Sequence, residues 1–165
     1  MKKIIMLILF LFFLSFLSGC GKGKNEYKEI KDEQIFMMEE DAYYIYFFRE
    51  DCSGCETTTP IVNFYLETIR NDKSGIYKNM RNIYGVCLEK DGEKSKIYRK
   101  YNGDKGDGTN GAYKVNGVLE WDKLYIASTP SLIAIYEEGG VRRAKYLAQG
   151  SSAVVEFLEN ALLKG

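Results

Sequence analysis

The sequence of 165 residues contains no histidine. Histidine is the most common general base, so its absence excludes Ser-His and Cys-His nucleophile pairs. The four cysteines are too few for a disulfide scaffold in a chain of this length. The formal net charge is zero, with 23 basic and 23 acidic residues, and gives no indication of a nucleic-acid partner. The remaining composition, 45% hydrophobic, is ordinary for one globular domain.

Two of the cysteines form a Cys-X-X-Cys motif, Cys52-Ser53-Gly54-Cys55. The aromatic and apolar run 43–48 before it predicts a buried central strand, and the apolar spacing in 57–70 predicts an amphipathic helix after it. A helix N-terminus offers unpaired N–H groups and a positive dipole end, which favour a thiolate on the first cysteine. We therefore interpret Cys52 as the attacking thiol and Cys55 as the resolving thiol of a reversible dithiol, which needs no cofactor.

Other roles of this motif have weaker support. A zinc site needs two further ligands, and the chain could supply only Cys20 and Cys87, so we expect no metal. A c-type haem site is excluded because Glu56 stands where the histidine is required. A purely structural disulfide gains little from closing a two-residue loop. Cys87 lies in the predicted strand 81–89, and we interpret it as an inert packed thiol and not as a third redox thiol.

The amino terminus has the features of an export signal. A short basic segment precedes an apolar run over residues 4–17, which is shorter than the ~20 residues that span a bilayer. The run ends in Leu17-Ser18-Gly19-Cys20, and the combination resembles a bacterial lipoprotein signal peptide. The resemblance implies that the thiol of Cys20 carries lipid and that cleavage precedes it. An uncleaved anchor and an ordinary secretory signal are the alternatives.

This interpretation divides the chain into three parts: a signal peptide that is removed (1–19), a lipidated tether (20–28) and a folded domain (29–165). The domain is then held at the cell membrane, outside the cytoplasm, by the lipid on Cys20. The mature chain would carry 21 basic residues, which is 23 minus Lys2 and Lys3, against 23 acidic ones. Lipid and not charge is therefore expected to hold it at the surface.

The rest of the chain predicts a mixture of strands and helices. Residues 29–41 suggest a short strand or helix, residues 131–147 a strand hairpin, and residues 154–162 a last helix capped by Ser151 or Ser152. The order predicts an α/β fold with a crossover between parallel strands and an antiparallel edge.

A long polar connection, 90–116, separates the second strand from the hairpin, and its residues 97–101 suggest a helical turn. The Gly- and Asp-rich run 103–111 within the connection does not match the ligand spacing of an EF-hand calcium loop. We therefore interpret this run as a flexible surface loop.

With these motifs in this order, residues 43–163 resemble the thioredoxin superfamily. The match rests on the motif with Cys52 and Cys55 at a strand–helix junction, on Pro60 five residues further on, and on Thr129-Pro130 before a buried strand. The resemblance implies a thioredoxin-like fold, a central mixed sheet flanked by helices, with a long insertion before a cis-proline loop. It also implies that Pro130 is cis and that Thr129 and Pro130 bind an extended substrate chain.

The chain departs from thioredoxins at three places. Asp51 stands where they have tryptophan, Ser53-Gly54 replaces Gly-Pro, and their buried strand aspartate falls at Tyr46. The carboxylates of Glu50 and Asp51 also disfavour a thiolate on Cys52 by like-charge repulsion. With its lipoprotein signal and long insertion, the chain looks more like the thioredoxin-like lipoproteins of Gram-positive bacteria, in particular bacteriocin transport accessory proteins.

The sequence thus leads us to expect a membrane-tethered, extracytoplasmic thiol–disulfide oxidoreductase. Its partners would be exported proteins, bound through mixed disulfides, and a membrane redox partner that recharges the dithiol. Oxidant, isomerase and reductant use the same residues, so the direction of electron flow stays open. The alternative is a non-catalytic thioredoxin-fold module that serves an exporter as accessory or chaperone.

Overall fold

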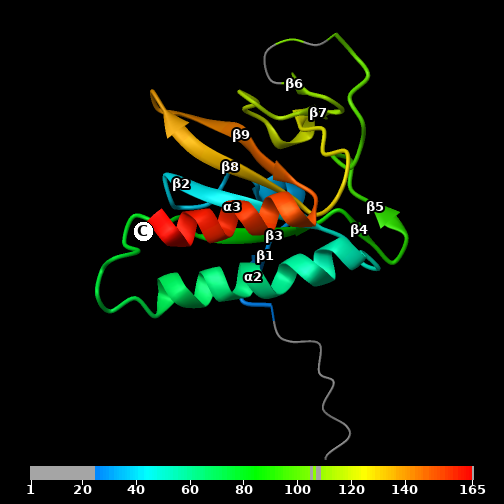
Figure 1. The fold of residues 1–165 in the computed structure, drawn as a ribbon. Coiled ribbons are helices and arrows are strands. Elements are labelled where there is room, and N and C mark those ends of the chain that lie inside the picture. Colours follow the sequence, from blue (N-terminus) through cyan, green and yellow to red (C-terminus); the bar gives the residue numbers. More distant parts are fainter. Residues whose placement is uncertain (1–24, 105, 107–108, 165) are drawn as a thin grey trace, which may run out of the picture.

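The computed structural model describes residues 25–104, 106 and 109–164. At its centre lies a five-stranded sheet with the order β1-β3-β2-β8-β9 (Figure 1). Strands β1 and β2 run parallel to β3, whereas β8 is antiparallel to β2 and β9 is antiparallel to β8. This confirms the predicted α/β pattern with a parallel crossover and an antiparallel edge. The strands are Lys28–Glu29 (β1), Ala42–Phe48 (β2), Ile83–Cys87 (β3), Ser131–Glu138 (β8) and Val141–Gln149 (β9).

Helix α2 (Ser53–Arg70) forms the crossover between β2 and β3. Its buried residues include Val62, Tyr65 and Leu66, at the three-to-four spacing of an amphipathic helix. The helix begins four residues before the predicted start at residue 57, because Cys52 takes the N-cap position. The prediction missed this because it followed the apolar spacing, which begins later than the hydrogen-bonded helix.

Helix α3 (Ser151–Lys164) follows β9. The expected capping role of Ser151 or Ser152 is wrong, because both residues lie inside the first turn of the helix. The carbonyl of Gly150 accepts the N–H of Val154 at 3.1 Å, so Gly150 precedes the helix in the capping position. Gly150 has a φ of 79°, which glycine adopts without the steric cost of a side chain.

Both helices cover the same face of the sheet. In β2 successive side chains alternate between the two faces, so Tyr46 points to the helices while Ile45 and Phe47 point away from them. The two helices lie side by side (Figure 1). The buried residues between the sheet and the helices are Tyr27, Tyr46, Val62, Tyr65, Leu66, Ile83, Leu132, Ala148, Val154 and Leu158.

The opposite face is covered by the long connection between β3 and β8, together with Ile30 and Ile35 from the segment before β2. No α-helix of the described residues packs on this face. Residues 90–116 of this connection were expected to be polar, yet Ile97 and Val115 within them are completely buried against the sheet. Leu88, Leu124 and Ile126, at the two ends of the connection, are completely buried as well. It therefore contributes a second apolar layer to the core. Its short elements are β4 (Glu89–Lys90), β5 (Glu93–Lys94), β6 (Thr109–Asn110), β7 (Tyr113–Lys114) and the 3-10 helix η2 (Trp121–Lys123).

The local structure of the connection differs from the sequence-based expectations. The predicted helical turn at 97–101 is wrong, because the backbones of Ile97 and Arg99 pair with Ile126 across the connection. Within the Gly- and Asp-rich run 103–111, residues 105, 107 and 108 lie outside the described residues, and the end of the run forms strand β6, which pairs with β7. Residues 29–41 hold the end of β1 and a 3-10 helix, η1 (Asp32–Gln34).

The amino-terminal part of the chain is described only from residue 25 onward. The expected signal peptide 1–19 and the expected lipidation site Cys20 lie outside the described residues. Neither α2 nor α3, nor any other helix of the described part, has the length and apolar character needed to cross a bilayer.

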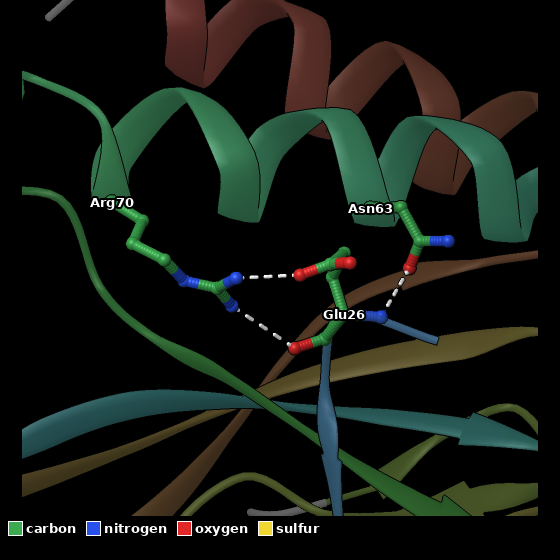
Figure 2. A network of polar contacts seen from close by, with 3 residues as sticks. All are labelled: Glu26, Asn63 and Arg70. Atoms are coloured by element: carbon green, nitrogen blue, oxygen red, sulfur yellow. Dashed lines mark hydrogen bonds and ion pairs between the residues drawn. The ribbon is translucent and has the colours of Figure 1, made fainter. Parts of the chain in front are cut away.

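The segment before β1 is attached to α2 by the polar contacts of Glu26 (Figure 2). The N–H of Glu26 donates to Oδ1 of Asn63 at 2.9 Å, and its carboxylate pairs with Nη1 of Arg70 at 2.5 Å. Nη2 of Arg70 also donates to the carbonyl of Glu26 at 3.2 Å. Since Arg70 is exposed, this ion pair contributes at most about 1 kcal/mol, but the three contacts fix where the chain enters the sheet.

Gly85 in the middle of β3 allows the ring of Tyr27 to lie directly on the strand. A methyl group at Gly85 would overlap the ring of Tyr27, which is buried and cannot move aside freely. We expect Gly85→Ala to lower the free energy of unfolding by about 1–3 kcal/mol, as measured by urea denaturation. Gly106→Ala is the matched control, because a methyl group there meets no atom of the described residues within 4 Å. A Gly85→Ala protein as stable as this control would contradict the packing.

Candidate functional site

Cys52 and Cys55 form a disulfide at the N-terminus of α2. Cys52 is the N-cap residue in extended conformation, and its Sγ accepts the N–H of Cys55 at 3.1 Å. Each cysteine is only 5% exposed, so the sulfurs can be approached from few directions. The structure therefore brings together the two cysteines that the sequence singled out, at the helix end where a thiolate would be favoured.

The turn from β2 into α2 passes through Asp51. This residue has a φ of 52°, in the left-handed region that non-glycine residues rarely adopt and that aspartate tolerates better than most. The N–H of its neighbour Glu50 donates to the carbonyl of Glu89 at 3.0 Å, which connects the turn to β4. The tight turn places Cys52 directly at the end of the central strand.

The loop before β8 lies against the disulfide. The peptide bond between Thr129 and Pro130 is cis, as the resemblance implied. Oγ1 of Thr129 lies 3.5 Å from Sγ of Cys52, and since a disulfide sulfur carries no hydrogen, the hydroxyl is the donor. Thr129 and Pro130, expected to bind substrate, thus lie beside the cysteine pair, although Thr129 is 77 residues away from Cys52 in sequence.

Gly54, inside the motif, is in close contact with the same loop. A methyl group at Gly54 would be 2.9 Å from Oγ of Ser151 and 3.0 Å from Cδ of Pro130. Ser151 was expected only as a possible helix cap, so its place beside the motif is a feature that the sequence did not reveal. The glycine in the motif is the one local signal, because it indicates a close approach by another part of the chain.

Tyr46, where the resemblance to thioredoxins implies the position of their buried aspartate, lies beneath the motif. Its hydroxyl donates to the carbonyl of Cys55 at 3.4 Å, and that carbonyl also accepts the Oγ1 hydroxyl of Thr59 at 2.8 Å. Burial raises the pKa of Tyr46 to about 12, and its contacts with Thr59 and Thr58 lower the pKa only in part. Tyr46 therefore stays protonated at the pH at which thiols ionise, and it cannot accept their protons.

A cavity of about 660 Å³ opens beside the disulfide, between α2 and the strands β1 and β3. The apolar side chains of Tyr27 and Phe48 line it together with Cys52 and Cys55. Thr129 and Pro130 are not among the described residues that line it. The disulfide thus borders both the cavity and the cis-proline loop.

Charged groups surround this cavity. Its lining contains four carboxylates, those of Glu29, Glu50, Asp51 and Glu56, and two cations, Arg49 and Lys90. The excess of negative charge opposes a thiolate on Cys52, while the N–H groups at the start of α2 favour it. Because all four carboxylates are exposed, solvent screens the repulsion, whereas the N–H group of Cys55 contacts the sulfur directly.

Cys87 lines the same cavity. It lies at the end of β3 opposite Phe48 of β2, and its S–H donates to the carbonyl of Glu89 at 3.3 Å. Its place near the end of a strand was expected, but the thiol is only half-buried. Burial raises the pKa of Cys87, so little of it is thiolate at neutral pH, and its inertness stays a prediction. Within residues 25–104, 106 and 109–164, no three Cys, Asp or Glu side chains gather as ligands for a metal ion.

The high pKa of Tyr46 leads to a prediction about alkaline stability. An unfolded tyrosine ionises near pH ~10, whereas the pKa of folded Tyr46 is about 12. The contribution of protonated Tyr46 to the free energy of unfolding is therefore fully present below pH ~10 and is lost as the pH rises from there to about 12. We expect the free energy of unfolding of Tyr46→Phe to fall less than that of the wild type between pH ~9 and ~11. Urea unfolding at each pH measures this, and an identical fall in both proteins would contradict it.

Comparison with known proteins adds no assignment to this geometry. No protein-family model matches the chain, and no curated protein matches it either.

Proposed function

We propose that this protein is a thiol–disulfide oxidoreductase of thioredoxin-like fold, tethered to the membrane and acting on exported proteins. The observation that carries the proposal is the disulfide at the start of α2, with the hydroxyl of Thr129 3.5 Å from Sγ of Cys52. A structural disulfide would need no such donor, and it stabilises little when it closes a loop of two residues. The mixed sheet with its β2-α2-β3 crossover is compatible with this fold.

The chemistry is exchange of sulfur–sulfur bonds. When the protein donates its disulfide, a substrate thiolate attacks Sγ of Cys52, the Cys52–Cys55 bond breaks, and Cys55 leaves with the electron pair. A second substrate thiolate then attacks the mixed disulfide, and Cys52 leaves as a thiolate. Two substrate thiols lose two electrons and two protons, and the Cys52–Cys55 pair gains them. Reduction of a substrate disulfide is the same sequence in reverse.

The residues around Cys52 suit the attacked and leaving sulfur. The N–H of Cys55 and the hydroxyl of Thr129 both contact Sγ of Cys52 as donors, and these contacts strengthen when the sulfur becomes negative. Cys55 is the resolving thiol. Three parts of the proposal rest on the sequence of residues 1–20. They are the location outside the cytoplasm, the lipid on Cys20, and a membrane partner that recharges the cysteine pair.

Substitution of each cysteine tests the reaction. In Cys55→Ser the mixed disulfide between Cys52 and a substrate cannot be resolved, so we expect exported proteins to accumulate on it. Full-length protein is expressed in bacterial cells, free thiols are alkylated, and adducts are identified by non-reducing electrophoresis and mass spectrometry. Cys52→Ser should trap nothing, and Cys87→Ser is the matched control that keeps the pair intact.

The outcomes separate the two candidate functions. Adducts that form on Cys55→Ser and not on Cys52→Ser support exchange through Cys52. If Cys55→Ser traps no protein, and Cys52→Ser keeps the cellular function of the wild type, exchange is not the function. The non-catalytic accessory or chaperone module for an exporter would then take its place.

The donors at Cys52 also predict the reduction potential. By stabilising the thiolate they favour the reduced pair, so we expect a potential nearer the about −180 mV of protein disulfide isomerase than the about −270 mV of thioredoxin. Thr129→Val keeps the shape but removes the hydroxyl and should lower the potential by about 20–40 mV. Equilibration of the full-length protein with glutathione in nonionic detergent measures both values. A wild-type potential at or below about −270 mV would indicate a reductant instead.

A further inference from the structure

A second hollow lies at the end of the molecule remote from the disulfide. It has a volume of about 550 Å³ and lies between the sheet, the loop before β3 and the last turn of α3. Figure 1 shows this end of α2 and α3 near the carboxyl terminus, opposite the start of α2. Its walls combine polar groups with aromatic and aliphatic side chains, among them Tyr44, Tyr65, Tyr136, Met80 and Leu147. We call this hollow the basal groove. Its size is typical of small-molecule sites.

The charged side chains in the described lining of the basal groove all have the same sign. Arg81, Lys145 and Lys164 line it, and the described lining contains no aspartate or glutamate. Within the described part of the chain, none of these three cations forms an ion pair. Lys164 also lies in the last turn of α3, where the helix dipole favours a cation. That explanation does not extend to Arg81, which precedes β3, or to Lys145, which lies on β9.

Arg81 is the best placed of the three for binding an anion. It is half-buried, and its guanidinium carbon lies 5.6 Å from the ring centre of Tyr44. Among the described residues the guanidinium donates no hydrogen bond, although it has five N–H groups that suit carboxylate, sulfonate or phosphate oxygens. The stacking on Tyr44 holds the group at the groove and leaves its donors available.

The tyrosines can add neutral donors. The hydroxyl of Tyr65 is used, because it donates to the carbonyl of Arg81 at 3.0 Å. The hydroxyls of Tyr44 and Tyr136 have no hydrogen-bond partner among the described residues. Burial raises the pKa of Tyr44, so its hydroxyl remains a donor at neutral pH. An anion in the groove would therefore meet both charged and neutral donors.

We propose that the basal groove binds small anionic amphiphiles, molecules with a carboxylate, sulfonate or phosphate group on an aromatic or aliphatic body. The anionic group pairs with Arg81, Lys145 and Lys164, and the apolar body packs on Tyr44, Tyr65 and Leu147. Neither cysteine of the disulfide lines this groove. Binding here is therefore independent of thiol exchange, and it would remain if the redox proposal failed.

A pair of probes tests the charge requirement. The full-length protein in nonionic detergent is titrated into 4-(trifluoromethyl)benzenesulfonate, and binding is followed by the ¹⁹F NMR line width and shift. The neutral 4-(trifluoromethyl)benzenesulfonamide has nearly the same shape and no charge, so it controls for partition into detergent and for apolar binding. We expect the sulfonate to bind more tightly than the sulfonamide, and salt to weaken the sulfonate alone.

Variants locate the binding. Lys145→Gln/Lys164→Gln changes two exposed side chains, so folding should be retained, and we expect the dissociation constant of the sulfonate to rise about fivefold or more. Arg81→Gln should have a larger effect. Lys96→Gln/Lys100→Gln removes the same charge outside the groove and should leave binding unchanged. A thermal melt of each variant checks its folding.

Three results would overturn the proposal. The first is equal affinity for sulfonate and sulfonamide, and the second is no sulfonate binding by the wild type at millimolar protein and probe. The third is an equal loss of sulfonate affinity in the groove double variant and in the control double variant. The last result would show attraction by overall charge and not by the basal groove.

Discussion

The pairing of β2 with strands on both of its sides is the constraint on which the site depends. Phe47 of β2 is opposite Ser131 of the antiparallel strand β8, and Phe48 is opposite Cys87 of the parallel strand β3. Three segments therefore meet at the carboxyl end of the central strand β2: the turn to Cys52, the loop with Thr129, and Cys87 at the end of β3. A shift of one residue in the β2–β8 register would turn the β8 side chains to the opposite face and displace Thr129 from Cys52.

The two faces of the sheet are covered by different means. Helices α2 and α3 cover one face, and a long connection with little regular structure covers the other. A strand buried on both faces needs apolar cover on both, which explains why this connection carries fully buried residues such as Leu124 and Ile126. The connection is thus part of the core, although its described residues 102–104, 106, 110 and 111 are exposed.

Both helices begin at the disulfide end of the molecule, since Ser151 at the start of α3 lies next to Gly54 in the first turn of α2. The positive ends of two helix dipoles therefore lie near Cys52 and favour a thiolate there. The carboxylates around the adjacent cavity have the opposite effect on the same thiolate. The carboxyl ends of both helices lie at the opposite end, where Arg81, Lys145 and Lys164 line the basal groove. Carboxylates therefore outnumber cations four to two around the cavity beside the disulfide, whereas the described lining of the basal groove carries three cations and no carboxylate side chain.

The sequence alone determined the features that depend on neighbouring residues. The spacing of Cys52 and Cys55, the strand before them, the helix with Val62 and Leu66, and the hairpin at 131–147 are local patterns, and the structure contains all of them. What only the tertiary structure decided are contacts between distant segments. The approach of Ser151 to Gly54, the cavity shared by Cys87 and the disulfide, and the burial of the connection depend on strand register and on which face each helix covers. These are set by the packing of the whole chain, and no short stretch of residues encodes them.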